Sequence, residues 1–73
     1  MKNSLKVQRA ILDITQEELA HRVGVTRQAI NAIERGKYVP STLLALKMGR
    51  IFGKPVEEIF ILEENDFDEA TSL

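Results

Sequence analysis

Hydrophobic residues recur every three or four positions through the first part of the chain, which is the spacing of an amphipathic helix. Over about residues 4–12 and one turn beyond, this spacing is kept by Val7, Ala10, Ile11 and Ile14. We therefore expect a first helix that turns these four apolar side chains toward the core.

Capping residues delimit the second helix. Thr15 is followed three residues later by Glu18, which is the capping-box pattern at a helix start. The helix should begin at Gln16 and end before Gly24, where glycine accepts a left-handed backbone.

Three more helices follow from the same signals. Thr26 can cap a third helix over residues 27–34, which Gly36 ends, and a fourth covers residues 42–52 up to Gly53. The inward-facing positions of these helices, and of a short fifth one after Pro55, are Ala29, Ile30, Ile33, Leu44, Met48, Ile51, Val56, Ile59 and Phe60. Five short helices without a strand pattern predict an all-α fold.

The four consecutive apolar residues 59–62 leave one alternative open. A run this short does not distinguish a helix from a strand, so a short strand is the other interpretation. It is also more apolar than one helical turn can bury, which makes Ile59, Ile61 and Leu62 candidates for a contact between two subunits. Packing in the chain's own core is the competing interpretation.

Size and composition exclude several classes of protein. The chain has 73 residues, 44% of them hydrophobic and 29% charged, which is typical of one folded domain. The longest apolar runs have four residues, far fewer than the roughly 20 of a membrane-spanning helix. Because there is no cysteine and no export-like start, we expect a cytoplasmic chain without disulfides.

An enzyme is also excluded by the residue types. His21 is the only histidine, and the neighbouring acids at 17/18, 57/58 and 63/64 point apart on a helix. We therefore expect no catalytic residue, metal site or cofactor.

Charge is segregated along the chain. Ten basic and four acidic residues lie in residues 1–54, whereas residues 55–73 hold seven acidic residues and no Lys or Arg. A basic body is typical of a phosphate-binding surface, and an acidic tail commonly only solvates the chain.

The second and third helices, joined by a tight turn that contains Gly24, match the helix-turn-helix unit over residues 16–35. The outward face of the third helix carries Arg27, Gln28 and Asn31. Arginine can bond two acceptors of guanine, and Gln or Asn can match adenine, so we predict that these three contact DNA bases. Arg27 stands at the positive end of its helix, where a cation is disfavoured unless it faces an anion; an arginine pointing into water is the alternative.

Phosphate contacts are expected beside the motif, because free amides and basic side chains at helix ends bind phosphate. The candidates are Gln16, Thr26, Arg35 and Lys37. For Tyr38, core packing is favoured slightly over a contact with DNA.

Two stretches, TQEELA at residues 15–20 and VGVTRQAINAIERGK at residues 23–37, resemble the Xre type of helix-turn-helix regulators, the phage Cro and C1 repressor class. The likeness covers about residues 5–62. It implies a compact five-helix, lambda-repressor-like domain that binds double-stranded DNA at a palindromic operator as a homodimer, usually as a repressor. The family's phosphate position falls on Gln16 and its base positions on Arg27, Gln28 and Asn31. Arg9 and Glu34 fall where the family often has a buried ion pair.

Three positions depart from the family pattern. Asp13 stands where glycine is common, Gly49 where alanine is common, and Thr42 where leucine is frequent. Gly49 should cost its helix about 1 kcal/mol.

The chain thus divides into a DNA-binding domain, residues 1–62, and an acidic tail, residues 63–73, which we expect to be mobile. The alternative function is an antitoxin or similar module, whose acidic tail binds a basic protein partner. No membrane association is expected.

Overall fold

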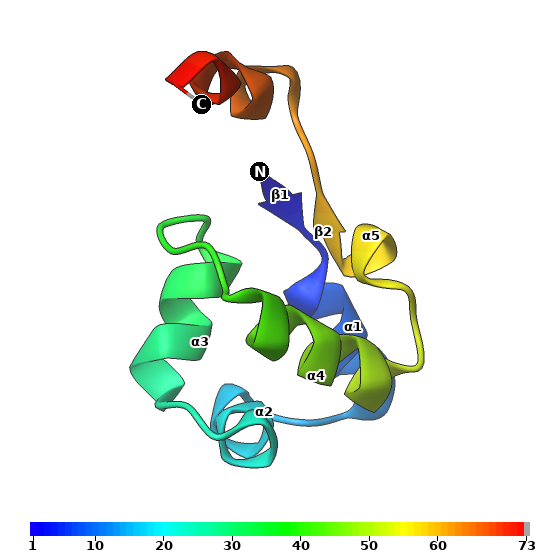
Figure 1. The fold of residues 1–73 in the computed structure, drawn as a ribbon. Helices are drawn as coiled ribbons and strands as arrows, with labels where there is room; N and C mark the ends of the chain where they lie inside the picture. The colour runs from blue at the N-terminus through cyan, green and yellow to red at the C-terminus, as the bar shows by residue number, and fades with distance from the viewer. Residues whose placement is uncertain (73) are drawn as a thin grey trace.

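The computed structural model describes residues 1–72, with side chains to residue 68 (Figure 1). Its α-helices are α1 (Leu5–Leu12), α2 (Gln16–Val23), α3 (Arg27–Glu34), α4 (Thr42–Phe52) and α5 (Val56–Ile59). Strand β1 (Lys2–Asn3) pairs with β2 (Phe60–Ile61), and a 3-10 helix, η1, covers Glu64–Ser72. The predicted five-helix, all-α architecture is confirmed, with a minimal two-stranded ribbon added to it.

The caps of α2 and α3 form as predicted. Thr15 Oγ1 accepts the Glu18 N–H at 3.0 Å, and a Glu18 carboxylate oxygen accepts the Thr15 N–H at 3.1 Å. Thr26 Oγ1 accepts the Ala29 N–H at 3.1 Å, and Gly24 adopts a φ of 78°. Local hydrogen bonds therefore fix where both helices begin and where α2 ends.

A single core lies between the helices. Its fully buried side chains come from α1, α2, α3, α4 and α5, namely Leu5, Leu19, Ile30, Ile33, Met48 and Ile59. Helix α2 packs against both α3 and α4, so α3 is supported from its buried side while its outer face stays at the surface.

The predicted inward face of α1 is wrong for Val7, Ala10 and Ile11, whereas Ile14, which follows the helix, is buried as predicted. Val7 and Ile11 are 58% and 65% exposed, whereas the buried positions of the helix are Leu5 and Gln8. Both sets satisfy helical spacing over eight residues. The structure buries the second set because Arg9, one turn after Leu5, must face α3 to reach Glu34.

The strands were not predicted as a pair. Lys2 is opposite Ile61 and Asn3 opposite Phe60 in an antiparallel register, and the Ser4 N–H donates to the Ile59 carbonyl at 2.8 Å. Phe60 therefore belongs to a strand, the alternative left open for this run, rather than to the fifth helix. A two-residue strand such as β1 is too short to leave an alternating pattern in a sequence.

Ile59 corrects one of the predicted subunit contacts. Its side chain is completely buried in the core of the same chain, so it offers no surface to a second copy. Ile61 and Leu62 remain 44% and 63% exposed.

Two departures from the family pattern can be followed in the structure. Asp13 ends α1 in a left-handed conformation with a φ of 56°, which glycine adopts without strain and which aspartate tolerates better than most residues. Gly49 is buried on α4, where an added Cβ would lie 3.0 Å from the Lys54 carbonyl oxygen. Glycine at position 49 therefore permits a close backbone approach.

The chain's first residue contacts the start of the acidic tail. The Met1 ammonium lies 2.9 Å from a Glu63 oxygen and 3.1 Å from an Asp66 oxygen. Figure 1 shows that an extended segment separates η1 from the helical body. The mobility expected for residues 63–73 stays a prediction. Within the described residues, none of the helices has the length and apolar character needed to cross a membrane.

Candidate nucleic-acid interface

Helix α3 divides into a buried and an outward face. Ile30 and Ile33 are 0% and 1% exposed and anchor α3 against the core. On the opposite side, Arg27 and Gln28 are exposed and Asn31 is half-buried. The structure thus places all three predicted base-contacting residues on one surface of α3.

Arg27 is a cation at the start of its helix. It occupies the first position of α3, where the helix dipole is positive, and α3 has no acidic residue in its first turn. Among the described residues, none forms an ion pair with it. This end of α3 is therefore electrostatically suited to an anion from outside the chain.

An open hollow of about 420 Å³ lies between α1, the start of α2 and the start of α3. Gln16 and Arg27 both line it, together with Arg9 and two acidic residues, Asp13 and Glu17. The amides at the start of α2 and the Arg27 guanidinium thus border the same hollow, and they are the donors that a phosphate would meet there.

The other predicted phosphate residues lie at the two ends of α3. Thr26 is exposed, although its hydroxyl already caps the helix. Arg35 and Lys37 follow the last turn and are exposed as well. Tyr38 differs from its expected core packing, because 54% of its surface is exposed beside them.

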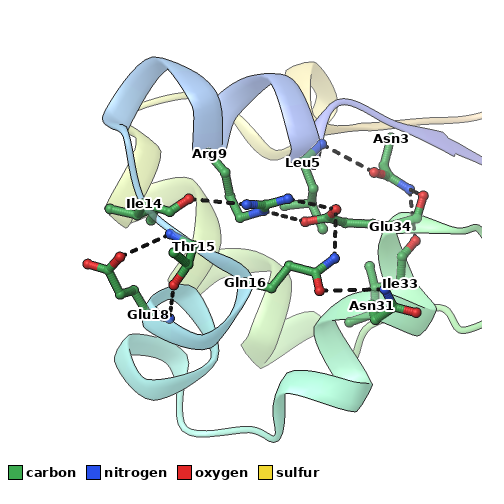
Figure 2. A network of polar contacts seen from close by, with 10 residues as sticks. All are labelled: Asn3, Leu5, Arg9, Ile14, Thr15, Gln16, Glu18, Asn31, Ile33 and Glu34. Carbon is green, nitrogen blue, oxygen red and sulfur yellow. Dashed lines mark hydrogen bonds and ion pairs between the residues drawn. The ribbon is translucent and has the colours of Figure 1, made fainter.

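An ion pair joins α1 to α3 behind this surface (Figure 2). Arg9 Nε lies 2.6 Å from Glu34 Oε2, and Arg9 Nη2 lies 3.1 Å from Glu34 Oε1. The two side chains are only 15% and 7% exposed, and the hydrogen bond with Glu34 raises the pKa of Arg9. Arg9 also donates to the Ile14 carbonyl at 3.1 Å, so the pair is held on both sides.

Hydrogen bonds connect the ion pair to two of the predicted DNA-contacting residues. Gln16 Nε2 donates to Glu34 Oε1 at 3.1 Å, and Asn31 Nδ2 donates to Gln16 Oε1 at 3.5 Å (Figure 2). From the sequence, Gln16 is predicted only as a phosphate contact, whereas the structure also ties its side chain to α3. No sequence signal indicates this link, since Gln16 and Glu34 are 18 residues apart.

Sequence reasoning also missed Asn3 as a support for α3. Its Nδ2 donates to the Ile33 carbonyl at 2.9 Å and to the Glu34 carbonyl at 3.4 Å. These bonds satisfy carbonyl groups at the end of α3 and join that end to β1.

Comparison with known proteins gives a consistent result. A helix-turn-helix family model matches residues 5–59. An uncharacterized HTH-type transcriptional regulator of Methanocaldococcus jannaschii is 53% identical over 66 residues, which cover 90% of this chain and 100% of that protein. A similarly named regulator of Bacillus subtilis is 52% identical over the same shares of the two chains. The cryptic phage CTXphi transcriptional repressor RstR of Vibrio cholerae is 32% identical over 89% of this chain and 56% of its own length.

Proposed function

This chain belongs to the Xre-type helix-turn-helix family of DNA-binding transcriptional regulators, which is not a family of enzymes, and from that premise we propose that it is a homodimeric repressor of a palindromic operator. The observation that carries the proposal is the outward face of α3. Its polar side chains are displayed at the surface while its apolar face is buried. Repression is further supported by the similarity to a phage repressor.

In this proposal α3 lies in the major groove and reads bases with Arg27, Gln28 and Asn31. An arginine fork matches the two acceptors of guanine, and the amides match the donor and acceptor of adenine. The surrounding contacts with phosphates are made by Gln16, Thr26, Arg35 and Lys37, which fix the position of α3 without reading sequence.

We propose a second copy because one eight-residue helix reads only a few base pairs, and a dimer reads two half-sites. We assign the contact between copies to Ile61 and Leu62, which are exposed apolar residues at the end of β2. Beside them, Phe60 and Leu46 line an open apolar hollow of about 280 Å³, which shares no residue with the outward face of α3. A two-fold contact here would leave both α3 helices free to meet successive major grooves about 34 Å apart.

Selection of bound DNA from a random pool, followed by sedimentation of the protein with and without the selected duplex, tests the proposal. We expect a palindromic sequence and a complex of two chains per duplex. A pool that shows no enrichment of any sequence would overturn DNA recognition.

A pair of matched variants tests the contact between copies. Leu62→Asp should shift the protein toward monomers and weaken operator binding. Ile11→Asp, which introduces the same charge at an equally exposed position of α1, should leave both unchanged. Equal sedimentation of the two variants would contradict the assigned contact.

A further inference from the structure

We propose that Glu34 is a positioning residue for DNA recognition, which sets the orientation of the Asn31 amide through Gln16 and thereby specifies adenine at one operator position. The inference rests on the proposed function, because it concerns how one of the base-reading residues is held. Glu34 itself does not touch DNA in this proposal.

The first step is the fixed position of the Glu34 carboxylate. Two hydrogen bonds from Arg9, at 2.6 and 3.1 Å, hold it, and only 7% of its side chain is exposed. In this ion pair both carboxylate oxygens of Glu34 face donors, and a carboxylate oxygen accepts hydrogen bonds and donates none.

The second step is the orientation of the Gln16 amide. Glu34 Oε1 accepts a hydrogen bond from Gln16 Nε2 at 3.1 Å. The reversed amide would place the Gln16 oxygen against a carboxylate oxygen, which is repulsive. Gln16 must therefore turn its nitrogen to Glu34 and its oxygen to Asn31.

The third step transfers this polarity to Asn31. Gln16 Oε1 accepts from Asn31 Nδ2 at 3.5 Å, because an amide oxygen cannot pair with another oxygen. One N–H of Asn31 is thereby used, and its second N–H and its Oδ1 remain for a base. This donor and acceptor match adenine N7 and N6 in the major groove, whereas guanine presents two acceptors.

Within the described residues, the chain of hydrogen bonds from Glu34 through Gln16 ends at Asn31 and does not include the other two predicted base readers. Among the described residues, neither Arg27 nor Gln28 has a side-chain hydrogen bond of this kind. We therefore expect Glu34 to affect discrimination at one base pair of each half-site and to leave the others unchanged.

The test measures dissociation constants for the selected operator and for each of its single base-pair variants. Glu34→Gln removes the fixed polarity, because an amide at position 34 can both donate and accept. We expect it to lower discrimination about fivefold at the base pair that Asn31→Ala identifies, within the range of one bidentate contact. In the double variant Glu34→Gln/Asn31→Ala, the first change should have no further effect on discrimination. Glu57→Gln, which removes the same charge from an exposed position of α5, is the matched control and should change nothing.

A second variant keeps the test decisive if loss of the ion pair weakens folding. Gln16→Met leaves Arg9 and Glu34 paired and removes the Gln16 amide, and with it both hydrogen bonds that connect Glu34 to Asn31. It should reduce discrimination at the same base pair, in addition to a uniform loss of affinity from the missing phosphate contact.

Three outcomes would overturn the inference. In the first, Glu34→Gln lowers affinity equally at every base pair, and the loss parallels the thermal unfolding of the variant. In the second, Gln16→Met leaves discrimination unchanged. In the third, Asn31→Ala has no position-specific effect. Failure of the wild-type protein to prefer any sequence would instead overturn the proposed function.

Discussion

At the scale of single residues, the position of Arg27 matters as much as its chemistry. A cation in the first turn of a helix is disfavoured by roughly 0.3–1 kcal/mol when it is exposed. Helix α2, by contrast, places Glu17 and Glu18 in its first turn, as the dipole favours. The unfavourable placement of Arg27 becomes favourable when a guanine edge or a phosphate accepts its hydrogen bonds.

Arg27→Ala should cost about 1–3 kcal/mol of binding free energy on the selected operator and relax the preference at one base pair. Titrations against the operator, its base-pair variants and random duplex measure this. Arg50→Ala, which removes an exposed arginine from α4, is the control and should have little effect. Equal weakening on operator and random DNA would make Arg27 a phosphate contact instead.

At the scale of elements, α1 and α4 show how packing overrides local pattern. In α1, Val7 and Ile11 share one face and Leu5 shares another with Arg9, and the ion pair of Arg9 with Glu34 of α3 decides which face turns inward. Gly49 in α4 is unfavourable by helix propensity, yet a Cβ at this position would lie only 3.0 Å from the Lys54 carbonyl oxygen. The Lys54 N–H also donates to the Gly49 carbonyl at 3.0 Å, which holds the turn after α4 in place.

Gly49→Ala should therefore fail to stabilise the protein, although helix propensity alone predicts a gain of about 1 kcal/mol. We expect a net loss of unfolding free energy, because the Lys54 carbonyl must move by a few tenths of an ångström. Urea unfolding measures it, with Thr42→Ala at an exposed position of the same helix as the propensity control. A gain of about 1 kcal/mol in unfolding free energy would show that the turn moves without a cost in free energy.

At the scale of the whole molecule, a basic body carries an acidic tail. Contacts with Met1 hold the start of the tail, chiefly a hydrogen bond from its ammonium to Glu63, which raises the pKa of that ammonium. The Glu63 N–H donates to Asp66 at 2.7 Å and lowers the pKa of the Asp66 carboxyl. The Asp66 contribution is therefore lost only as pH falls through that lowered pKa. The Met1 contribution is lost only as pH rises through its raised pKa, so the contact persists at neutral pH.

Deletion of residues 63–73 should leave operator affinity unchanged or slightly raise it, because five acidic residues are removed. Titrations at two salt concentrations measure the effect, and any gain should shrink at the higher one. A chain in which the five acids are replaced by their amides is the control for charge without truncation. A clear loss of affinity in the deleted chain would show that the tail contributes to binding.

Much of the helix-turn-helix unit could be predicted from sequence alone. Thr15, Glu18, Gly24 and Thr26 determine where α2 and α3 begin and where α2 ends, because each acts on backbone groups within a few residues. The spacing of apolar residues every three or four positions in α3 then separates its buried face from the face that carries Arg27.

Only the tertiary structure decided the remainder. Four features depend on contacts between residues that are distant in sequence or on separate elements. They are the inward face of α1, the pairing of β1 with β2, the close approach at Gly49 and the chain of contacts from Arg9 to Asn31. Such contacts depend on how whole elements pack, and the order of residues within one element does not indicate which other elements pack against it. Sequence therefore determined which residues form the outward face of α3, and packing decided which of them are held by hydrogen bonds to other elements.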